Sequence, residues 1–172
     1  RWTLVIHGGA GQMTRDTVTA QTDTGTRAGL ATALDAGIAI LSAGGTAVDA
    51  VEAAVRVLED DPHFNAGRGA CLTIAGATEL DAAIMDGRDR RAGAVAGSRS
   101  ARHPVSLARA VMMDSPHVFL AGNGADEFGR DTGIEQADAD WFVTDERQRH
   151  LEELKTRGGD AFDVDMKYGT VG

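Results

Sequence analysis

Residues 46–62 read Thr-Ala-Val-Asp-Ala-Val-Glu-Ala-Ala-Val-Arg-Val-Leu-Glu-Asp-Asp-Pro, and this stretch predicts an amphipathic helix. Thr46 and Asp49 have the spacing of two residues that cap the start of a helix. Pro62 has no backbone N–H, so it prevents the helix from continuing. Apolar residues recur at helical spacing and predict one buried face, formed by Val48, Val51, Val55 and Leu58.

The chain before this helix predicts a strand and a second helix. Trp2 to Ile6 is a short apolar run that leads into the glycine cluster of residues 8 to 11, as expected for a buried strand entering a tight turn. From about Thr24 to Ala43 the pattern is helical, and Gly44-Gly45 is a common way to end a helix. Its predicted buried residues are Leu30, Leu34, Ile38 and Leu41.

The chain after residue 69 predicts strands first and helices later. Ala70 to Ile74, Glu79 to Met85 and Arg91 to Ala96 have the composition of strands joined by turns, which favours an antiparallel meander. Further predicted elements are a helix opened by Pro104, a strand over 117–121, a short helix over 124–130 and a charged helix over 145–155, capped by Thr144. Two helices followed by antiparallel strands predict an α+β domain rather than alternating βαβ units.

Composition limits the classes of partner. A chain of 172 residues with 42% hydrophobic residues can bury the core of one domain. The net charge of −9 disfavours nucleic acid and anionic membrane surfaces as partners. Cys71 is the only cysteine, so no internal disulfide is expected, and residues 1–6 have no signal-peptide pattern. We therefore expect a cytoplasmic protein, with a periplasmic location left open if a signal was removed.

Three short motifs could carry chemistry: His7-Gly8-Gly9-Ala10-Gly11, Phe64-Asn65-Ala66-Gly67-Arg68-Gly69 and Gly169-Thr170-Val171-Gly172. The first motif lacks the spacing of a dinucleotide fingerprint or a P-loop. In the last motif, a threonine hydroxyl is a weak nucleophile unless a base lies beside it. The free α-amino group of the same residue, with a pKa of about 8, can act as that base once the preceding bond is cut. The histidines show no spacing typical of a zinc site.

Together the three motifs resemble the plant-type asparaginase and isoaspartyl aminopeptidase family of N-terminal-nucleophile hydrolases. The resemblance implies a four-layer αββα sandwich built from the α and β segments of one precursor. Residues 1–156 would be the α portion, 157–169 a linker to the cleavage site and 170–172 the start of the β segment. The β subunit is then the expected partner, in an (αβ)2 heterotetramer.

The resemblance also implies site residues. Thr170 would be the nucleophile, released by cleavage of its bond to Gly169, with Gly9, Gly11 and Asn65 as support around it. No organic cofactor is expected. A structural sodium ion would be bound by the backbone carbonyls of Leu58, Glu59, Asp61, Phe64, Ala66 and Arg68, and hard cations prefer such oxygen ligands.

The function implied is hydrolysis of β-aspartyl (isoaspartyl) dipeptides, and of L-asparagine, to release L-aspartate. A glycosylasparaginase-type activity is the alternative within the family, although residues 167–169 read Lys-Tyr-Gly and lack the His-Asp pair of that branch. Two readings from other classes stay open. The chain could be a non-catalytic fragment that offers an interaction surface, or a structural module that only binds a cation.

Overall fold

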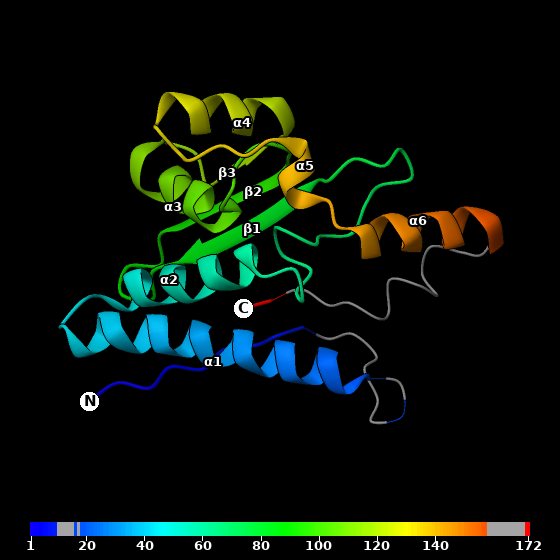
Figure 1. The fold of residues 1–172 in the computed structure, drawn as a ribbon. Coiled ribbons are helices and arrows are strands. Elements are labelled where there is room, and N and C mark those ends of the chain that lie inside the picture. The colour runs from blue at the N-terminus through cyan, green and yellow to red at the C-terminus, as the bar shows by residue number, and fades with distance from the viewer. Residues whose placement is uncertain (10–15, 17, 158–170) are drawn as a thin grey trace.

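The computed structural model describes residues 1–9, 16, 18–157 and 171–172, and within them the chain forms three strands and six helices (Figure 1). The strands are β1 (Leu80–Met85), β2 (Ala92–Ser98) and β3 (Phe119–Ala121). The helices are α1 (Ala20–Ser42), α2 (Ala47–Asp60), α3 (Pro104–Asp114), α4 (Gly122–Asp131), α5 (Ala139–Phe142) and α6 (Asp145–Arg157). None of these described helices has both the length and the apolar character needed to cross a membrane.

The start of α2 is as the sequence predicts. The Thr46 hydroxyl accepts from the backbone N–H of Asp49 (3.1 Å), and the Asp49 carboxylate accepts from the N–H of Thr46 (3.2 Å). Val48 and Leu58 are buried as expected. Val51 is 37% exposed, so its place in the predicted buried face is wrong. Alanines 50 and 54 are buried instead, because this side of α2 faces α1.

The face that α1 buries differs from the predicted one by one position. Its buried residues are Gly29, Ala33 and Gly37, whereas Ile38 is 37% exposed. These small residues let α1 approach α2 closely. A Cβ on Gly37 would lie 3.1 Å from the Ala50 carbonyl oxygen. The leucines of the predicted face flank this contact and are only partly buried.

The sheet has the order β1-β2-β3 and is mixed. β1 and β2 pair antiparallel through a hairpin, with Ala83 opposite Ala94, but β3 runs parallel to β2. The predicted antiparallel pairing of 79–85 with 91–96 is therefore confirmed, and the strand predicted separately over 117–121 forms as β3, parallel to β2. Two parallel strands must be joined by a crossover connection, and α3 lies in that connection. β2, α3 and β3 therefore form one βαβ unit, which the α+β prediction did not include.

Two predicted strands are absent from the described residues. Over 70–74 there is only an isolated bridge between Leu72 and Thr78, because the chain turns back at Gly76, which has φ +80°. Over 2–6 no strand forms, and Val5 is 80% exposed. Within the described residues no strand pairs with this segment, so its backbone N–H and C=O groups form no ladder there.

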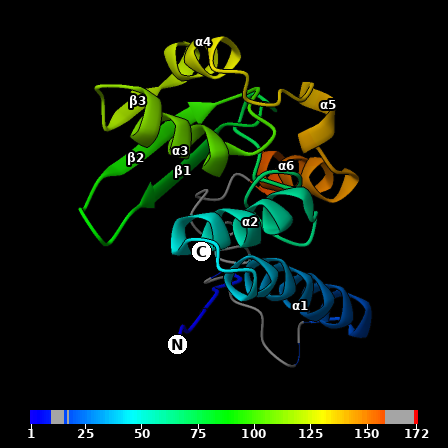
Figure 2. The ribbon, with the colours of Figure 1, turned by 90° about the vertical axis from the view of Figure 1, so that its left-hand side faces the viewer.

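α3 packs across β1 and β2 and covers one face of the sheet (Figure 2). The main core lies between them and includes Ile84, Val95, Leu107 and Val111. A close approach at Gly93 sets the distance between β2 and α3. A Cβ at this glycine would lie 2.1 Å from the carbonyl oxygen of Ala108 and 2.5 Å from the backbone nitrogen of Met112.

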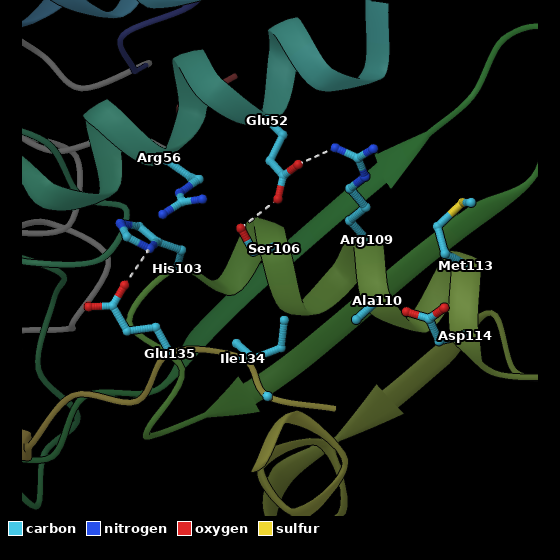
Figure 3. A pocket seen from close by; sticks show the side chains of 11 residues that line it. Glu52, Arg56, His103, Ser106, Arg109, Ala110, Met113, Asp114, Ile134 and Glu135 are labelled. Atoms are coloured by element: carbon cyan, nitrogen blue, oxygen red, sulfur yellow. Dashed lines mark hydrogen bonds and ion pairs between the residues drawn. The ribbon is translucent and has the colours of Figure 1, made fainter. Parts of the chain in front are cut away.

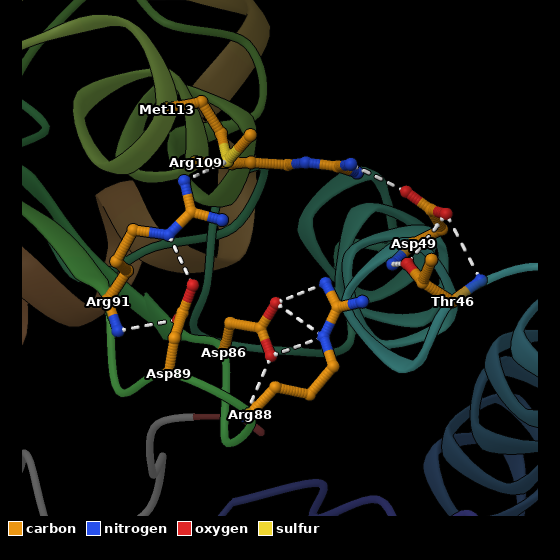
Figure 4. Close-up of polar contacts among 8 residues, drawn as sticks. All are labelled: Thr46, Asp49, Asp86, Arg88, Asp89, Arg91, Arg109 and Met113. Carbon is orange, nitrogen blue, oxygen red and sulfur yellow. Dashed lines mark hydrogen bonds and ion pairs between the residues drawn. The ribbon is translucent and has the colours of Figure 1, made fainter.

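Ion pairs join α2 to α3 and also lie within the β1–β2 hairpin (Figure 4). Arg109 of α3 binds Asp49 (2.5 Å) and also Glu52 of α2. In the hairpin, Arg88 donates to Asp86 (2.6 Å), and this hydrogen bond lowers the pKa of the Asp86 carboxyl to about 2. Arg91 reaches the Met113 sulfur at the end of α3 (3.7 Å). The hairpin turn is thus stabilised by charge as well as by backbone bonds.

Gly93→Ala is expected to destabilise the fold by about 1–3 kcal/mol or more, because the new methyl group overlaps backbone atoms of α3 that cannot rotate away. Urea denaturation would measure the change. Gly87→Ala is the matched control, since a Cβ at Gly87 meets no atom within 4 Å. Equal stability of the two variants would contradict the close packing described here.

Candidate functional site

The end of the described chain lies beside the segment that precedes the first glycine cluster. His7 and Gly172 exchange two backbone hydrogen bonds: the His7 N–H donates to the Gly172 carbonyl, and the Gly172 N–H donates to the His7 carbonyl (2.9 Å). This exchange is the hydrogen-bonded pair of an antiparallel ladder. The first and last motifs of the sequence are therefore adjacent in space.

Phe64 joins the middle motif to the other two. Its side chain is 1% exposed and packs in a cluster with Leu58, to which Val171 also contributes. A Cβ at Gly8 would lie 3.3 Å from the Phe64 ring. The three motifs, which are far apart in the sequence, thus meet at one apolar cluster that contains Phe64.

The loop of residues 61–69, called here the 61–69 loop, folds back on the last turn of α2. The Arg68 N–H donates to the Glu59 carbonyl (2.7 Å), and the Phe64 N–H donates to the Asp61 carbonyl (3.1 Å). Gly67 makes this possible, because a Cβ there would lie 2.5 Å from the Glu59 carbonyl oxygen. The loop backbone therefore lies directly against the end of the helix.

Asn65 is held within this loop. Its side-chain oxygen accepts from the backbone N–H of Cys71 (2.8 Å), and the residue is half-buried. The bond engages the carbonyl end of the amide and fixes its orientation. A supporting role toward the nucleophile would then fall to the NH2 group of Asn65.

The structure describes some of the predicted site residues and not others. Gly9 is described and has φ +120°, a conformation that favours glycine. Gly11, Gly169 and Thr170 lie outside the described residues. The six residues whose carbonyls are predicted to bind sodium are all described and lie within positions 58–68.

Side chains do not offer an alternative metal site in the described part of the chain. No three His, Cys, Asp or Glu residues come together there in a way that could hold an ion. Backbone oxygens could still do so, since each carbonyl has two lone pairs. The Glu59 and Asp61 carbonyls each accept one loop hydrogen bond, which leaves a second lone pair on each oxygen.

The Glu59 side chain is an unusual buried acid beside the loop. It is 2% exposed, and one oxygen accepts from the backbone N–H of Val105 (2.9 Å) at the start of α3. Its other oxygen, Oε2, has no hydrogen-bond partner among the described residues. Burial raises the pKa of this carboxyl well above its ordinary value, against the opposing effect of the Val105 N–H. Glu59 therefore favours its neutral form.

A polar pocket of about 440 Å³ lies between α2, α3 and residues 133–135 (Figure 3). It contains none of the predicted site residues. Its lining includes Glu52, Arg56, His103, Arg109 and Glu135.

His103 is the buried titratable residue of this lining. Its Nε2 lies 3.1 Å from the Asp60 carboxylate, and its Nδ1 lies 4.0 Å from that of Glu135. Burial lowers the pKa of His103, although the Asp60 carboxylate opposes this shift. The pocket is therefore lined by a buried imidazole whose pKa is lowered and by side chains that join α2 to α3.

Sequence reasoning missed the residues that hold the 61–69 loop from outside. Arg147 of α6 is 4% exposed and donates to the Gly69 carbonyl. Trp141 of α5 lies under the guanidinium groups of Arg68 (4.9 Å) and Arg102 (4.4 Å). Arg147 stands in a helix rich in charges, so no pattern distinguishes it. Trp141 lies in a short apolar run of the sequence, which does not indicate its partners.

Comparison with known proteins agrees with this arrangement of motifs. The sequence profile of the asparaginase family matches residues 1–172. The chain belongs to this family.

Relatives in the asparaginase family match nearly the whole chain. It is 46% identical to an isoaspartyl peptidase/L-asparaginase of Mus musculus over 98% of its length, covering 51% of that protein. A probable isoaspartyl peptidase/L-asparaginase 2 of Arabidopsis thaliana is 42% identical over 94% of the chain and 49% of that protein. An isoaspartyl peptidase of Salmonella typhimurium is 41% identical over 98% of the chain and 56% of that protein. The chain spans about half the length of the curated relatives it matches.

In this asparaginase-family chain, we expect the stability of Glu59→Gln relative to the wild type to increase as the pH rises from 4 to 7. Because the pKa of Glu59 is raised in the folded state, the unfolded chain loses the Glu59 proton at a lower pH than the folded chain does. The free energy of unfolding of the wild type therefore falls as the pH rises from the unfolded-state pKa to the folded-state pKa of Glu59. Glutamine removes this effect, which is at most about 1.4 kcal/mol per pH unit. Urea denaturation at several pH values checks it, and a constant difference between the proteins would contradict a buried neutral acid.

Proposed function

We propose that this chain is the α portion of an N-terminal-nucleophile hydrolase that cleaves itself before Thr170 and hydrolyses β-aspartyl dipeptides and L-asparagine. One observation carries the proposal. The hydrogen-bonded pair of His7 and Gly172, together with the contacts of Phe64, brings the three motifs to one place. The names of the relatives support the substrate class, and the activity belongs to the assembly that includes the downstream half.

Self-cleavage would use groups that the chain itself supplies. The Thr170 hydroxyl attacks the carbonyl carbon of Gly169, and the acyl group moves from the Thr170 nitrogen to its oxygen. Water then hydrolyses this ester, which leaves a carboxylate on Gly169 and a free amine on Thr170. Glycine before the threonine suits this step, because it has no Cβ to block the approach.

The substrate reaction would repeat the same chemistry with an outside amide. The α-amino group of Thr170 takes the hydroxyl proton while the oxygen attacks the side-chain amide carbonyl of the substrate. The proton passes to the leaving amine, which departs as ammonia from asparagine or as the second amino acid from a dipeptide. Water cleaves the remaining β-aspartyl ester and releases L-aspartate.

The 61–69 loop would support this centre through a sodium ion. The proposed ligands are the carbonyls of Leu58, Glu59, Asp61, Phe64, Ala66 and Arg68. The fold-back of the loop on α2 fits such a site, because it gathers main-chain oxygens where a side chain on Gly67 would not fit. The ion would hold the loop carbonyls together against their mutual repulsion and so keep Phe64 and Asn65 in place.

The downstream half would complete the sheet. The face of the sheet opposite α3 includes Ala83 and Met85 of β1 and Phe119 of β3, which are exposed. Met85 is 60% and Phe119 53% exposed. A second sheet on this apolar face would give the proposed αββα sandwich, with an (αβ)2 assembly built from two such units.

Thr170→Ala in the full-length protein is expected to abolish both self-cleavage and aspartate release, because the variant has no hydroxyl. Mass spectrometry would show an uncut chain, and an assay of aspartate from a β-aspartyl dipeptide would show no turnover. Thr156→Ala is the matched control, since this hydroxyl donates to the Glu152 carbonyl within α6 and belongs to none of the three motifs. Turnover that survives in Thr170→Ala would refute the mechanism.

Sodium is expected to raise the melting temperature of the full-length protein more than choline does at equal ionic strength. A ligand that binds only the folded state at 100 times its Kd contributes about 2.7 kcal/mol. Gly67→Ala should reduce this sodium-specific gain, because its methyl group would displace the Glu59 carbonyl. Gly87→Ala serves as the control. Identical melting curves in the two salts would count against a sodium site.

A further inference from the structure

Segment 141–147 holds the 61–69 loop from outside, at Gly69. The Gly69 N–H donates to the Phe142 carbonyl (2.8 Å), and the Gly69 carbonyl accepts from Arg147 Nε. Both backbone polar groups of Gly69 are thus bound by the segment that joins α5 to α6. Phe142 is fully buried, so this contact is part of the core.

Gly69 cannot adjust easily if this contact is lost. Its φ is +84°, and a Cβ there would lie 2.6 Å from the Pro62 carbonyl oxygen. Gly69 is buried, and it packs against Pro62 at the start of the loop. The Gly69 N–H belongs to the peptide plane that carries the Arg68 carbonyl, one of the proposed sodium ligands, and its bond to Phe142 fixes that plane. The Arg147 bond to the Gly69 carbonyl fixes the next plane, between Gly69 and Ala70, so Gly69 is held on both sides.

A second contact acts on the same side of the loop. The Arg68 and Arg102 guanidinium groups both lie over the Trp141 ring, at 4.9 and 4.4 Å from its centre. Arg102 also binds the Asp60 carboxylate at the end of α2 (3.1 Å). Cation–π contacts of this kind are attractive, because the face of the indole ring is electron-rich. Arg68 is therefore held by its side chain, and Gly69 by its backbone.

Arg147 bonds to the 61–69 loop and lies in α6, the last helix before the proposed cleavage site in the sequence. It is buried in the first turn of α6, and α6 runs on to Arg157, after which the chain leads to the proposed cleavage site at Gly169–Thr170. Arginine suits this role because its planar guanidinium stays charged and can donate in a fixed direction. The helix before the cleavage site is thus bonded directly to the loop that the nucleophile would depend on.

We propose that Arg147 is a positioning residue: it fixes the Gly69 peptide and so sets the arrangement of the 61–69 loop on which sodium affinity and turnover depend. This inference rests on the proposed function. Arg147 does not touch the reacting atoms in this scheme. It acts through the loop, and its loss should change the loop's function more than the stability of the fold as a whole.

The test uses full-length protein with Arg147→Met, which keeps the length and apolar stem of the side chain but donates no hydrogen bond. Arg149→Met is the matched control, because Arg149 is exposed on the same helix and its loss removes the same charge. Three quantities are measured: the fraction cleaved before Thr170, the sodium concentration for half-maximal thermal stabilisation, and kcat with KM for aspartate release.

We expect Arg147→Met to raise the half-maximal sodium concentration about tenfold and to lower kcat by a similar factor, with KM changed less than twofold. Arg149→Met should match the wild type in all three quantities. Arg147→Lys should behave like Arg147→Met, because lysine keeps the charge but cannot reproduce the Nε bond. It also carries the comparison if the methionine variant does not fold.

A variant whose melting temperature falls equally at all sodium concentrations, with wild-type kcat and sodium response, would overturn the proposal and make Arg147 a structural anchor only. Equal loss of function in Arg149→Met would overturn it as well, since the effect would then come from charge. Failure of the proposed function has a different signature. In that case the wild-type protein itself neither cleaves before Thr170 nor releases aspartate.

Discussion

The fold-back of residues 61–69 on the end of α2 is the constraint on which the rest of the structure depends. Pro62 stops the helix, and the absence of side chains at Gly67 and Gly69 lets the backbone pass within contact distance of the Glu59 and Pro62 carbonyls. This path delivers the Phe64 ring into the cluster between α1 and α2. Without it, neither the chain end at Val171 nor the bend at Gly8 would have a common surface to pack on.

The same turn of α2 also organises α3. Pro104 opens α3 but has no N–H, and His103 before it makes no capping hydrogen bond with its side chain. The Glu59 carboxyl supplies the missing acceptor to the Val105 N–H. Burying an acid is costly unless it becomes neutral, and the raised pKa of Glu59 is the result. Glu59 thus joins two parts of the fold. Its backbone carbonyl binds the 61–69 loop, and its side chain binds α3, the helix that covers the sheet.

Elements whose signals are local could be predicted from the sequence, and elements set by distant partners could not. The capping pair Thr46 and Asp49 lies within one turn, so the start of α2 was predictable. The direction of β3 depends on where α3 returns the chain, and the buried face of α1 depends on how closely α2 approaches Gly37. For the site, the motifs could be found as short glycine-rich strings. Arg147 could not, because its importance comes from the Gly69 carbonyl, 78 positions away.

The arrangement of the loop explains why a reactive threonine would need support from residues so far away in the sequence. A backbone that gathers several carbonyl oxygens at one place creates repulsion, and such a path persists only when other contacts hold it. Here the contacts come from three sides: the α2 end through Glu59, the segment 141–147 through Gly69, and the apolar cluster through Phe64. Each acts on a different part of the loop, so these contacts and the proposed ion would together hold the loop in one shape. A nucleophile placed beside it would find its surroundings already in position, which reduces the reorganisation that the reaction itself must supply.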